Sequence, residues 1–415
     1  MKIGLACNNY PPFVGGIEIH AQQIAQELSK RHEVVVAAMN FEVSRLPRRL
    51  GMLHHNLLAR STRDRMDGDI PIHSLAPSTS EKLMMLPMAM RAMPRLQRWF
   101  YHEINRITHP FYARVVAPKI AGYFAGCDIV HSLAGGDLGQ AAEKAARREG
   151  AAFICTPFVH PGQWGDGPDD GALYSRADAV IGLVQSDRDH LEKIGVPAGK
   201  LHVIGVSPNL PAEVDGAAFR KKHGLNGKPM VLYIGRMMKQ KGAFAIIEAS
   251  GLIWKSHPDV QFVFIGPAGA DEQKIFDGCD MRIRYLGKVS LREKADALSA
   301  CNVFCMPSTS EILPTVYLEA WSLGKPVIGG TAHGLRELVE GNGAGVCSIQ
   351  APVELASAIV SILDNDNLKT EFGTNGRNLV VKQYSIEAVV SQLENLYKSV
   401  APHRTPDSTG ISLHA

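Results

Sequence analysis

The sequence predicts an α/β protein built from two doubly wound domains, and three observations lead to that fold. The chain has 415 residues, which is too long for one ordinary hydrophobic core and suggests two or three domains. Short, continuous apolar runs alternate with helical patterns through most of the chain, as in parallel sheets that helices cover on both faces. The alternation pauses once, between Gly205 and Pro229, and then restarts.

The expected strands are the apolar runs themselves. In the first half they are predicted at Lys2–Cys7, Glu33–Met39, Cys127–Ser132, Ala152–Pro157 and Ala179–Leu183. In the second half they are predicted at Pro229–Gly235, Val260–Gly266, Arg282–Leu286, Val303–Pro307 and Pro326–Gly330. Ligands of open α/β sheets bind at the edge where the strands end. Two such domains facing each other would therefore enclose a ligand-binding cleft.

The pause divides the chain into a first domain, 1–205, and a second domain, 206–384. A helix over 385–400 is expected to pack back on the first domain, and the polar, Pro-containing tail 401–415 is expected to be disordered. The stretch 44–114 breaks the alternation. It contains twelve Lys or Arg against five Asp or Glu, so it is a basic excursion from the first domain.

Whole-chain composition excludes several classes of protein. The net charge of +3 offers no general attraction for nucleic acid. The seven cysteines are scattered and mostly lie in apolar runs, which is typical of reduced, buried thiols in a cytoplasmic protein. The N-terminus lacks the apolar core of a signal peptide, and no apolar run is as long as the roughly 18 residues of a membrane-spanning helix. We therefore expect a cytoplasmic protein.

The loop after the first strand contains Gly15 and Gly16 directly before an expected helix at Ile17–Lys30. A glycine pair there lets backbone N–H groups approach an anion, and the helix dipole adds favourable charge. A tight turn with no ligand is the plainer alternative.

Arg236 and Lys241 follow the first strand of the second domain and precede a helix expected at Ala243–Ser250. Cations at a helix N-terminus oppose its dipole, so this placement makes sense if a polyphosphate lies between them. Arginine can bind phosphate oxygens bidentately, whereas lysine acts as a point charge. A solvated basic turn is the alternative.

Two carboxylates, Glu311 and Glu319, flank the start of a helix expected to begin near Pro314 or Thr315. Glu311 then lies in the loop before this helix, and Glu319 lies about one turn inside it. Both carboxylates can face one cleft, although such a pair can also be an ordinary charged helix face.

In this order the segments resemble family 4 of the nucleotide-sugar-dependent glycosyltransferases, which have the two-domain GT-B fold. The resemblance runs from residue 1 to about 400 and thins between about 41 and 125. Its most specific element is the pair Glu311 and Glu319, followed by Gly324-Lys325-Pro326-Val327. Other elements are PPFVGGIEIHAQQIAQEL, CDIVHS, RADAVIGLVQSDRDHLEKIGVP, GRMMKQKG and AHGLRELVEGNGAGV.

The resemblance implies a role for each candidate residue. Gly16, beside Gly15, would bring its amide to the donor diphosphate, which Arg236 and Lys241 would neutralise as it leaves. Glu319 would bind the ribose hydroxyls, and Glu311 would bind hydroxyls of the transferred sugar. His160 matches the family's active-site histidine. Further donor contacts are implied for the backbone of Leu313, Pro314 and Thr315 and, beside the base, for Lys288 and Val289.

The resemblance also implies a reaction that retains the anomeric configuration, by front-face substitution, with no cofactor and no metal. Arg236, Lys241 and two helix N-termini can do the electrostatic work of a cation. Asp169 and Asp170 lie in a Gly/Pro-rich stretch, where we expect them to be solvated rather than to bind a metal.

Three departures from the family pattern leave the identity of the transferred sugar undetermined. Pro314 stands in the helix-start segment and has no N–H to offer a ligand. Pro161 follows His160 where an acidic residue is common, and Gly266-Pro267-Ala268-Gly269 replaces a loop that is often acidic.

Two other functions remain possible from the sequence. One is a GT-B sugar-nucleotide epimerase, and the other is a non-catalytic subunit that binds a sugar or a partner. For a transferase, the acceptor would be a glycan, a glycolipid or a small molecule, in bacterial-type polysaccharide or glycolipid biosynthesis.

The basic excursion also has two interpretations, a core-packing helical segment or an element that docks on an anionic membrane. In the second, an arginine cluster and a downstream apolar surface would share the contact. The arginines are Arg45, Arg48, Arg49, Arg60, Arg63 and Arg65, and the apolar side chains are Met84, Met85, Met88, Met90, Met93, Leu96, Trp99, Phe100 and Tyr101.

Overall fold

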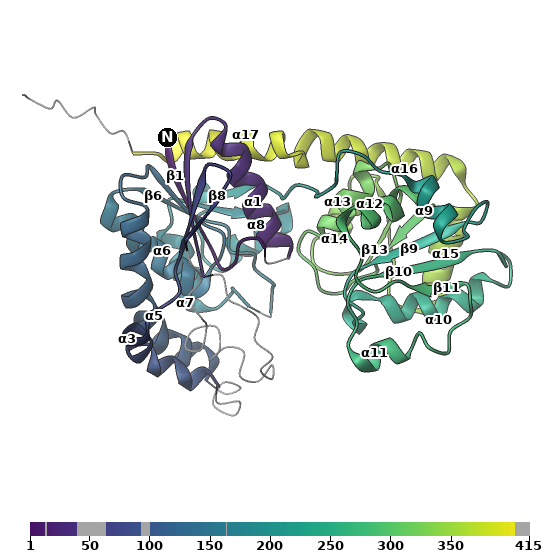
Figure 1. Cartoon of the computed structure of the whole chain (residues 1–415), viewed down its shortest axis with the longest axis horizontal. Helices are drawn as coiled ribbons and strands as arrows, with labels where there is room; N and C mark the ends of the chain where they lie inside the picture. Colours follow the sequence, from purple (N-terminus) through teal and green to yellow (C-terminus); the bar gives the residue numbers. More distant parts are fainter. Residues whose placement is uncertain (13–14, 40–63, 93–99, 163, 403–415) are drawn as a thin grey trace, which may run out of the picture.

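A computed structural model describes residues 1–12, 15–39, 64–92, 100–162 and 164–402. They form two bodies, each with a sheet between layers of helices, and the helical stretch 366–400 runs along one side of both (Figure 1). The expectation of two Rossmann-like α/β domains is confirmed.

The N-terminal sheet has eight strands in the order β3-β4-β2-β1-β5-β6-β7-β8. All neighbours pair in parallel except β3 and β4, which are antiparallel. The strands are β1 (Lys2–Cys7), β2 (Glu33–Ala38), β3 (Arg65–Asp67), β4 (Ile70–Ser74), β5 (Ile129–Ser132), β6 (Ala152–Cys155), β7 (Ala179–Gly182) and β8 (Leu201–Val203).

Helices cover both faces of this sheet, which explains why its strands are continuously apolar. Along β1, Ile3 and Leu5 belong to the same buried cluster as Ala21 of the first helix, whereas Ala6 belongs to the opposite cluster. The helical segments are α1 (Gly16–Ser29), α3 (Thr79–Met84), a 3₁₀ segment (Leu86–Ala92), α5 (Tyr101–Tyr123), α6 (Gly136–Glu149), α7 (Pro168–Arg176), α8 (Gln185–Lys193) and a 3₁₀ turn (Ala198–Lys200).

The C-terminal sheet has six strands in the order β11-β10-β9-β12-β13-β14, all parallel. Its strands are β9 (Met230–Ile234), β10 (Gln261–Ile265), β11 (Ile283–Tyr285), β12 (Val303–Cys305), β13 (Val327–Gly329) and β14 (Gly345–Cys347). Its helical segments are α9 (Gly216–Lys222), a 3₁₀ turn (Lys239–Lys241), α10 (Ala243–Ile253), α11 (Ala270–Lys274), α12 (Leu291–Ala300), α13 (Thr315–Ser322), α14 (Leu335–Val339), α15 (Pro352–Leu363), α16 (Asp366–Leu379), a π-helical turn (Val380–Tyr384) and α17 (Ile386–Val400).

Helix α17 leaves the C-terminal domain and docks on the N-terminal one (Figure 1). The hydroxyl of Tyr397 lies 2.7 Å from Nδ1 of the buried His131 on β5. Nearer the surface, Glu394 accepts a hydrogen bond from Arg31 at 2.9 Å and lies 3.0 Å from Nε2 of His32. The two domains are therefore joined by a packed helix as well as by the chain between β8 and α9.

The basic excursion is only partly within the described residues. Met85 and Met88 are buried against α5, which agrees with the core-packing interpretation of the excursion and removes these two from the surface that membrane docking would use. Leu83, Met84 and Leu86 beside them are exposed. Most of the arginine cluster, residues 93–99 and the tail beyond 402 lie outside the described residues.

All seven cysteines are free thiols, and five of them are buried. Cys279 and Cys347 are partly exposed, which corrects the expectation of burial for these two. Cys279 lies in the connection before β11, and Cys347 ends β14, an edge strand. In the part of the chain that the structure describes, no helix combines the length and the apolar character needed to cross a membrane.

Candidate active site

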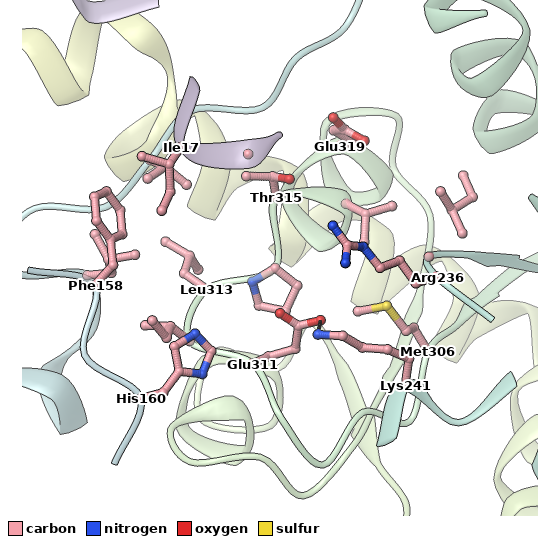
Figure 2. Close-up of a pocket in the computed structure, with 18 of the residues that line it drawn as sticks. Ile17, Phe158, His160, Arg236, Lys241, Met306, Glu311, Leu313, Thr315 and Glu319 are labelled. Carbon is pink, nitrogen blue, oxygen red and sulfur yellow. Dashed lines mark hydrogen bonds and ion pairs between the residues drawn. The ribbon is translucent and has the colours of Figure 1, made fainter. Parts of the chain in front are cut away.

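A cavity of about 440 Å³ lies between the two domains, where strands of both sheets end (Figure 2). The N-terminal domain contributes the start of α1 and the loop after β6. The C-terminal domain contributes the loop after β9 and the loop between β12 and α13. The cavity is therefore the interdomain cleft that two facing parallel sheets predict.

Gly16 begins α1 and lines this cavity. A Cβ at Gly16 would meet no atom within 4 Å, whereas a Cβ at Gly15 would lie 2.2 Å from a carboxylate oxygen of Glu18. A side chain at 15 would therefore have to displace the Glu18 carboxylate, whereas the space beside Gly16 is open. That space lets a ligand approach the N-terminus of α1, where N–H groups point outwards.

The loop after β9 places two cations in the wall. The loop ends at Gly242, whose φ of 84° is a backbone conformation that favours glycine. A Cβ at this position would also lie 2.6 Å from the Pro307 ring. Arg236 is exposed to the cavity and makes no ion pair with any described residue. Lys241 points into the same space (Figure 2).

Lys241 is held by the loop that precedes α13. Its Nζ lies 2.5 Å from Oε1 of Glu311 and donates to the carbonyl of Ser310 at 2.7 Å. Burial raises the pKa of the Glu311 carboxyl, and the nearby Lys241 cation opposes that rise. Sequence reasoning assigned the two residues to separate parts of a ligand, but here they form one ion pair.

Glu319 forms a second, more deeply buried pair. Its side chain is 3% exposed, and its Oε1 lies 2.6 Å from Nζ of Lys294 on α12. Burial raises the pKa of Glu319, and Lys294 together with a backbone hydrogen bond from Asn209 opposes the rise. Both residues of the pair line the cavity, so this carboxylate reaches the ligand space with its charge already compensated.

His160 faces Glu311 and Lys241 from the loop after β6 (Figure 2). Its ring lies against that of Trp164, with centroids 3.9 Å apart, and the two residues exchange backbone hydrogen bonds of 3.1 Å. Burial and the Lys241 cation lower the pKa of His160 to about 4. Near neutral pH the imidazole is therefore uncharged, with one nitrogen to donate and one to accept a hydrogen bond.

Phe158 stands two residues before His160 and has a φ of 51°. This left-handed conformation costs a non-glycine residue about 1–2 kcal/mol. The ring lines the cavity and is only 9% exposed. Packing of the ring thus holds the backbone in a conformation that the residue would not adopt alone.

The segment before α13 completes the wall. Leu313, Pro314 and Thr315 all line the cavity, and α13 begins at Thr315 with Pro314 as its N-cap. The first-turn amides of a helix have no partner within the helix. The start of α13 therefore offers backbone N–H groups to the cavity from Thr315 onwards, but Pro314 has no N–H to offer.

Three predicted residues lie outside this wall as the structure describes it. Gly15 caps α1 behind Gly16, Lys288 is exposed, and Val289 packs against the core. Conversely, sequence reasoning missed Lys294, Phe158 and Trp164, which do line the cavity. No motif marks Lys294, since only the packing of α12 near α13 brings it to Glu319.

Among the described residues, no group of three or more His, Cys, Asp or Glu side chains is arranged to hold a metal ion. The charges that face the cavity are instead the two lysine–glutamate pairs and Arg236. Such a wall can bind an anion through Arg236 and the start of α1, and hydroxyl groups through the two carboxylates.

Comparison with known proteins identifies the family. The model of glycosyl transferases group 1 matches residues 215–379, and that of the glycosyl transferase 4-like domain matches residues 15–207. The chain belongs to the family 4 glycosyltransferases. Between them, the two matches span both domains.

Curated relatives of this chain include the alpha-D-kanosaminyltransferase of Streptomyces kanamyceticus, 28% identical over 237 residues that cover 54% of this chain and 61% of that protein. The phosphatidyl-myo-inositol mannosyltransferase of Mycobacterium tuberculosis (strain ATCC 25618 / H37Rv) is 28% identical over 204 residues, 46% of this chain and 54% of that one. The matches thus span little more than half the length of these relatives.

Solved structures share the fold over nearly the whole chain. Anabaena HepE in complex with UDP and glucose has a TM-score of 0.67 and 18% identity, and the superposition covers 96% of this chain and 100% of HepE. This likeness establishes the GT-B architecture.

The Lys294–Glu319 pair leads to a stability prediction. Lys294→Met leaves a buried carboxylate without its cation, so the free energy of unfolding should fall by about 3 kcal/mol, at the lower end of the range for broken buried pairs. The double variant Lys294→Met/Glu319→Leu should recover most of that loss, because no charge is left unpaired. Urea unfolding measures both.

The control is Lys222→Met, because Lys222 forms an equally short pair of 2.6 Å with Glu293, but its side chain is 64% exposed. This variant should lose less than about 1 kcal/mol. Equal losses for Lys222→Met and Lys294→Met would contradict the structural importance of the buried pair.

Proposed function

We propose that this chain is a retaining, metal-independent glycosyltransferase that moves a sugar from a nucleoside diphosphate sugar to an acceptor hydroxyl, in polysaccharide or glycolipid biosynthesis. One observation carries the proposal. Two cations, Arg236 and Lys241, converge with two carboxylates, Glu311 and Glu319, on a single interdomain cavity. A nucleoside diphosphate sugar carries the complementary anionic and hydroxyl groups.

In this reaction the diphosphate lies beside Arg236 and the starts of α1 and α13, where positive charge meets the developing negative charge of the leaving group. The bond from the sugar carbon to the phosphate oxygen breaks, and the acceptor oxygen bonds to the same carbon from the same face. The acceptor's proton passes to the leaving phosphate. Glu319 binds the ribose hydroxyls, Glu311 binds hydroxyls of the sugar, and neutral His160 contacts the sugar near the reacting carbon.

The diphosphate contact is tested by removing Arg236. Arg236→Ala should weaken binding of the preferred nucleoside diphosphate by about 1.5–3 kcal/mol, the usual range for a hydrogen bond to a charged group. Calorimetric titration with UDP, GDP and ADP measures the loss and also identifies the nucleotide. Lys239→Ala is the matched control, since Lys239 is exposed in the same loop but does not line the cavity. Equal losses in the two variants would show that Arg236 makes no specific contact.

Metal independence leads to a separate prediction. Because Arg236, Lys241 and two helix N-termini supply the positive charge, donor turnover should be unchanged in excess EDTA. The measurement is release of the nucleoside diphosphate with and without chelator. Loss of turnover on chelation, restored by Mg²⁺ or Mn²⁺, would reject a metal-free mechanism.

Product analysis in the same assay separates the alternatives. A transferase releases the nucleoside diphosphate and a free or transferred sugar. A GT-B epimerase would first convert the donor into its epimer, and a non-catalytic subunit would bind nucleotide without turnover. The ion-paired glutamates and Arg236 in one cavity favour the transferase.

We further propose that the N-terminal domain contacts anionic membrane. Leu83, Met84 and Leu86 form an exposed apolar patch in the basic excursion, and apolar patches beside basic residues favour anionic lipid surfaces. At low salt the protein should co-sediment with anionic vesicles, and Leu83→Ser/Met84→Ser should reduce that binding severalfold.

The control variant for the membrane contact is Met281→Ser, because Met281 is 86% exposed but lies on the C-terminal domain. It should bind the vesicles as the unaltered chain does. Failure of the unaltered chain to bind anionic vesicles at low salt would exclude the membrane contact.

A further inference from the structure

A hollow of about 480 Å³ lies in the C-terminal domain, at the edge of the sheet where the strands begin. Asn302 directly precedes β12 and Pro326 directly precedes β13, and both residues line the hollow. The interdomain cavity lies at the opposite edge, where strands end, and none of the described residues lines both spaces. A ligand of this hollow would therefore be separate from a ligand of the interdomain cavity.

The hollow is formed where helix α16 packs closely on the turn that follows α13. Lys369, Gly373 and Arg377 succeed one another at intervals of four residues, so they lie on one face of α16. A Cβ at Gly373 would collide with the backbone carbonyl oxygen of Gly324. Close contact between the two backbones thus fixes the position of α16 relative to the turn.

Three cations line the hollow, Lys325 from the turn and Lys369 and Arg377 from α16. Its wall, all of which lies within the described residues, contains no aspartate or glutamate. Lys369 pairs with Asp366 at 2.6 Å, but that carboxylate is 94% exposed and is not part of the wall. Three like charges gathered in one hollow raise one another's energy unless an anion lies among them.

Two of these cations also cap helices, which is the plainest reason for their presence. Nε of Arg377 donates to the carbonyl of Ser322, the last residue of α13, at 3.2 Å. Nζ of Lys369 donates to the carbonyl of Leu363, the last residue of α15, at 3.0 Å. Capping of this kind is common at helix C-termini. It leaves the two terminal nitrogens of Arg377 and the ammonium of Lys325 without a hydrogen bond or ion pair to any described residue.

Asn302 adds a neutral donor to the wall. Its Oδ1 accepts hydrogen bonds from Nη2 of Arg220 at 2.8 Å and from the backbone N–H of Met230 at 2.9 Å. The side-chain amide is thereby oriented, and its NH₂ group is what it can still offer. The polar groups that remain available in the hollow are therefore mainly donors of hydrogen bonds, and two of them are charged.

We propose that this hollow is a binding site for a phosphate group, with Lys325 and Arg377 as its charged ligands and Asn302 as a further donor. A phosphate oxyanion offers only acceptors, an arginine fork can contact two of its oxygens, and a lysine adds a point charge. The site does not depend on the proposed glycosyltransferase function, because it lies apart from the interdomain cavity. The phosphate belongs either to a small soluble compound or to a lipid headgroup.

Calorimetric titration of the full chain with inorganic phosphate, at constant ionic strength, tests the site. Binding should be saturable, and Lys325→Gln should weaken it at least fivefold, because one of the two free charged donors is lost. The Lys325 ammonium makes no contact with the described residues whose loss would unfold the chain. Arg377→Lys keeps a cation near the Ser322 carbonyl but loses the fork, and it should weaken binding severalfold.

The matched control is Lys382→Gln, because Lys382 is exposed on the turn after α16, carries the same charge and does not line the hollow. Its affinity for phosphate should stay within twofold of that of the unaltered chain. Equal losses in Lys325→Gln and Lys382→Gln would show only a general attraction between charges and would overturn the site. Absence of saturable binding to the unaltered chain would overturn it as well.

Arg236→Ala separates this site from the interdomain cavity, which Arg236 lines. Phosphate binding that Lys325→Gln weakens should persist in Arg236→Ala. Phosphate binding that is lost in Arg236→Ala but kept in Lys325→Gln would place the anion in the interdomain cavity and overturn the second site.

Vesicles distinguish the two sources of the phosphate. The unaltered chain and Lys325→Gln are sedimented with vesicles that contain phosphatidic acid, and any contact made by the N-terminal domain is the same in both. Reduced sedimentation of Lys325→Gln, together with its weaker phosphate binding, supports the site and assigns it to a lipid headgroup. Unchanged sedimentation with weaker phosphate binding supports the site and assigns it to a soluble compound.

Discussion

In both domains neighbouring strands pair in parallel, except at the β3–β4 edge, so nearly every strand-to-helix loop leaves its sheet at one edge. The two sheets turn these edges towards each other, and the interdomain cavity lies between them. Gly16, His160, Arg236 and Glu311 are far apart in the chain but all follow strand ends. Parallel pairing brings the loops of each sheet to one edge, and the facing of the two edges brings all four residues to one cavity.

This constraint is also why much of the fold could be predicted from the sequence. Strands covered on both faces must be continuously apolar, and β1 was predicted residue for residue, while β9 and β10 were predicted to within one residue at each end. Four strands were not predicted, β3, β4, β8 and β14, and each is short or partly polar. Strand β3 is Arg-Met-Asp at an edge, and β14 has three residues beginning with glycine. Hydrophobic pattern carries too little information to detect such strands.

The residues of the candidate site likewise divide into those that the sequence identifies and those that it does not. Residues in loops beside helix starts, such as Gly16 and Arg236, could be found because their residue types make sense only at that place in an α/β unit. Lys294 could not be found from the sequence, because α12 has an ordinary charged surface. Only tertiary packing makes Glu319 the partner of Lys294. Phe158 could not either, since nothing in its sequence neighbourhood specifies a positive φ. Asp170 was misjudged because glycine and proline around it suggested a solvated loop, whereas they lead into α7.

The ion pairs also bear on how a donor would enter. Before any ligand binds, Lys241 is already engaged by Glu311, and Lys294 by Glu319. Each pairing offsets the cost of a buried carboxylate. Arg236 has no such partner among the described residues, so it is the cation that can meet an incoming diphosphate without giving up another interaction. In the proposed reaction Lys241 then shares its charge between Glu311 and the phosphate. Negative charge growing on the leaving group would draw the ammonium away from Glu311, and the carboxylate would then accept hydrogen bonds from the sugar hydroxyls more strongly. The pair can thus couple departure of the diphosphate to tighter binding of the sugar, which is the kind of interaction that favours a transition state over the ground state.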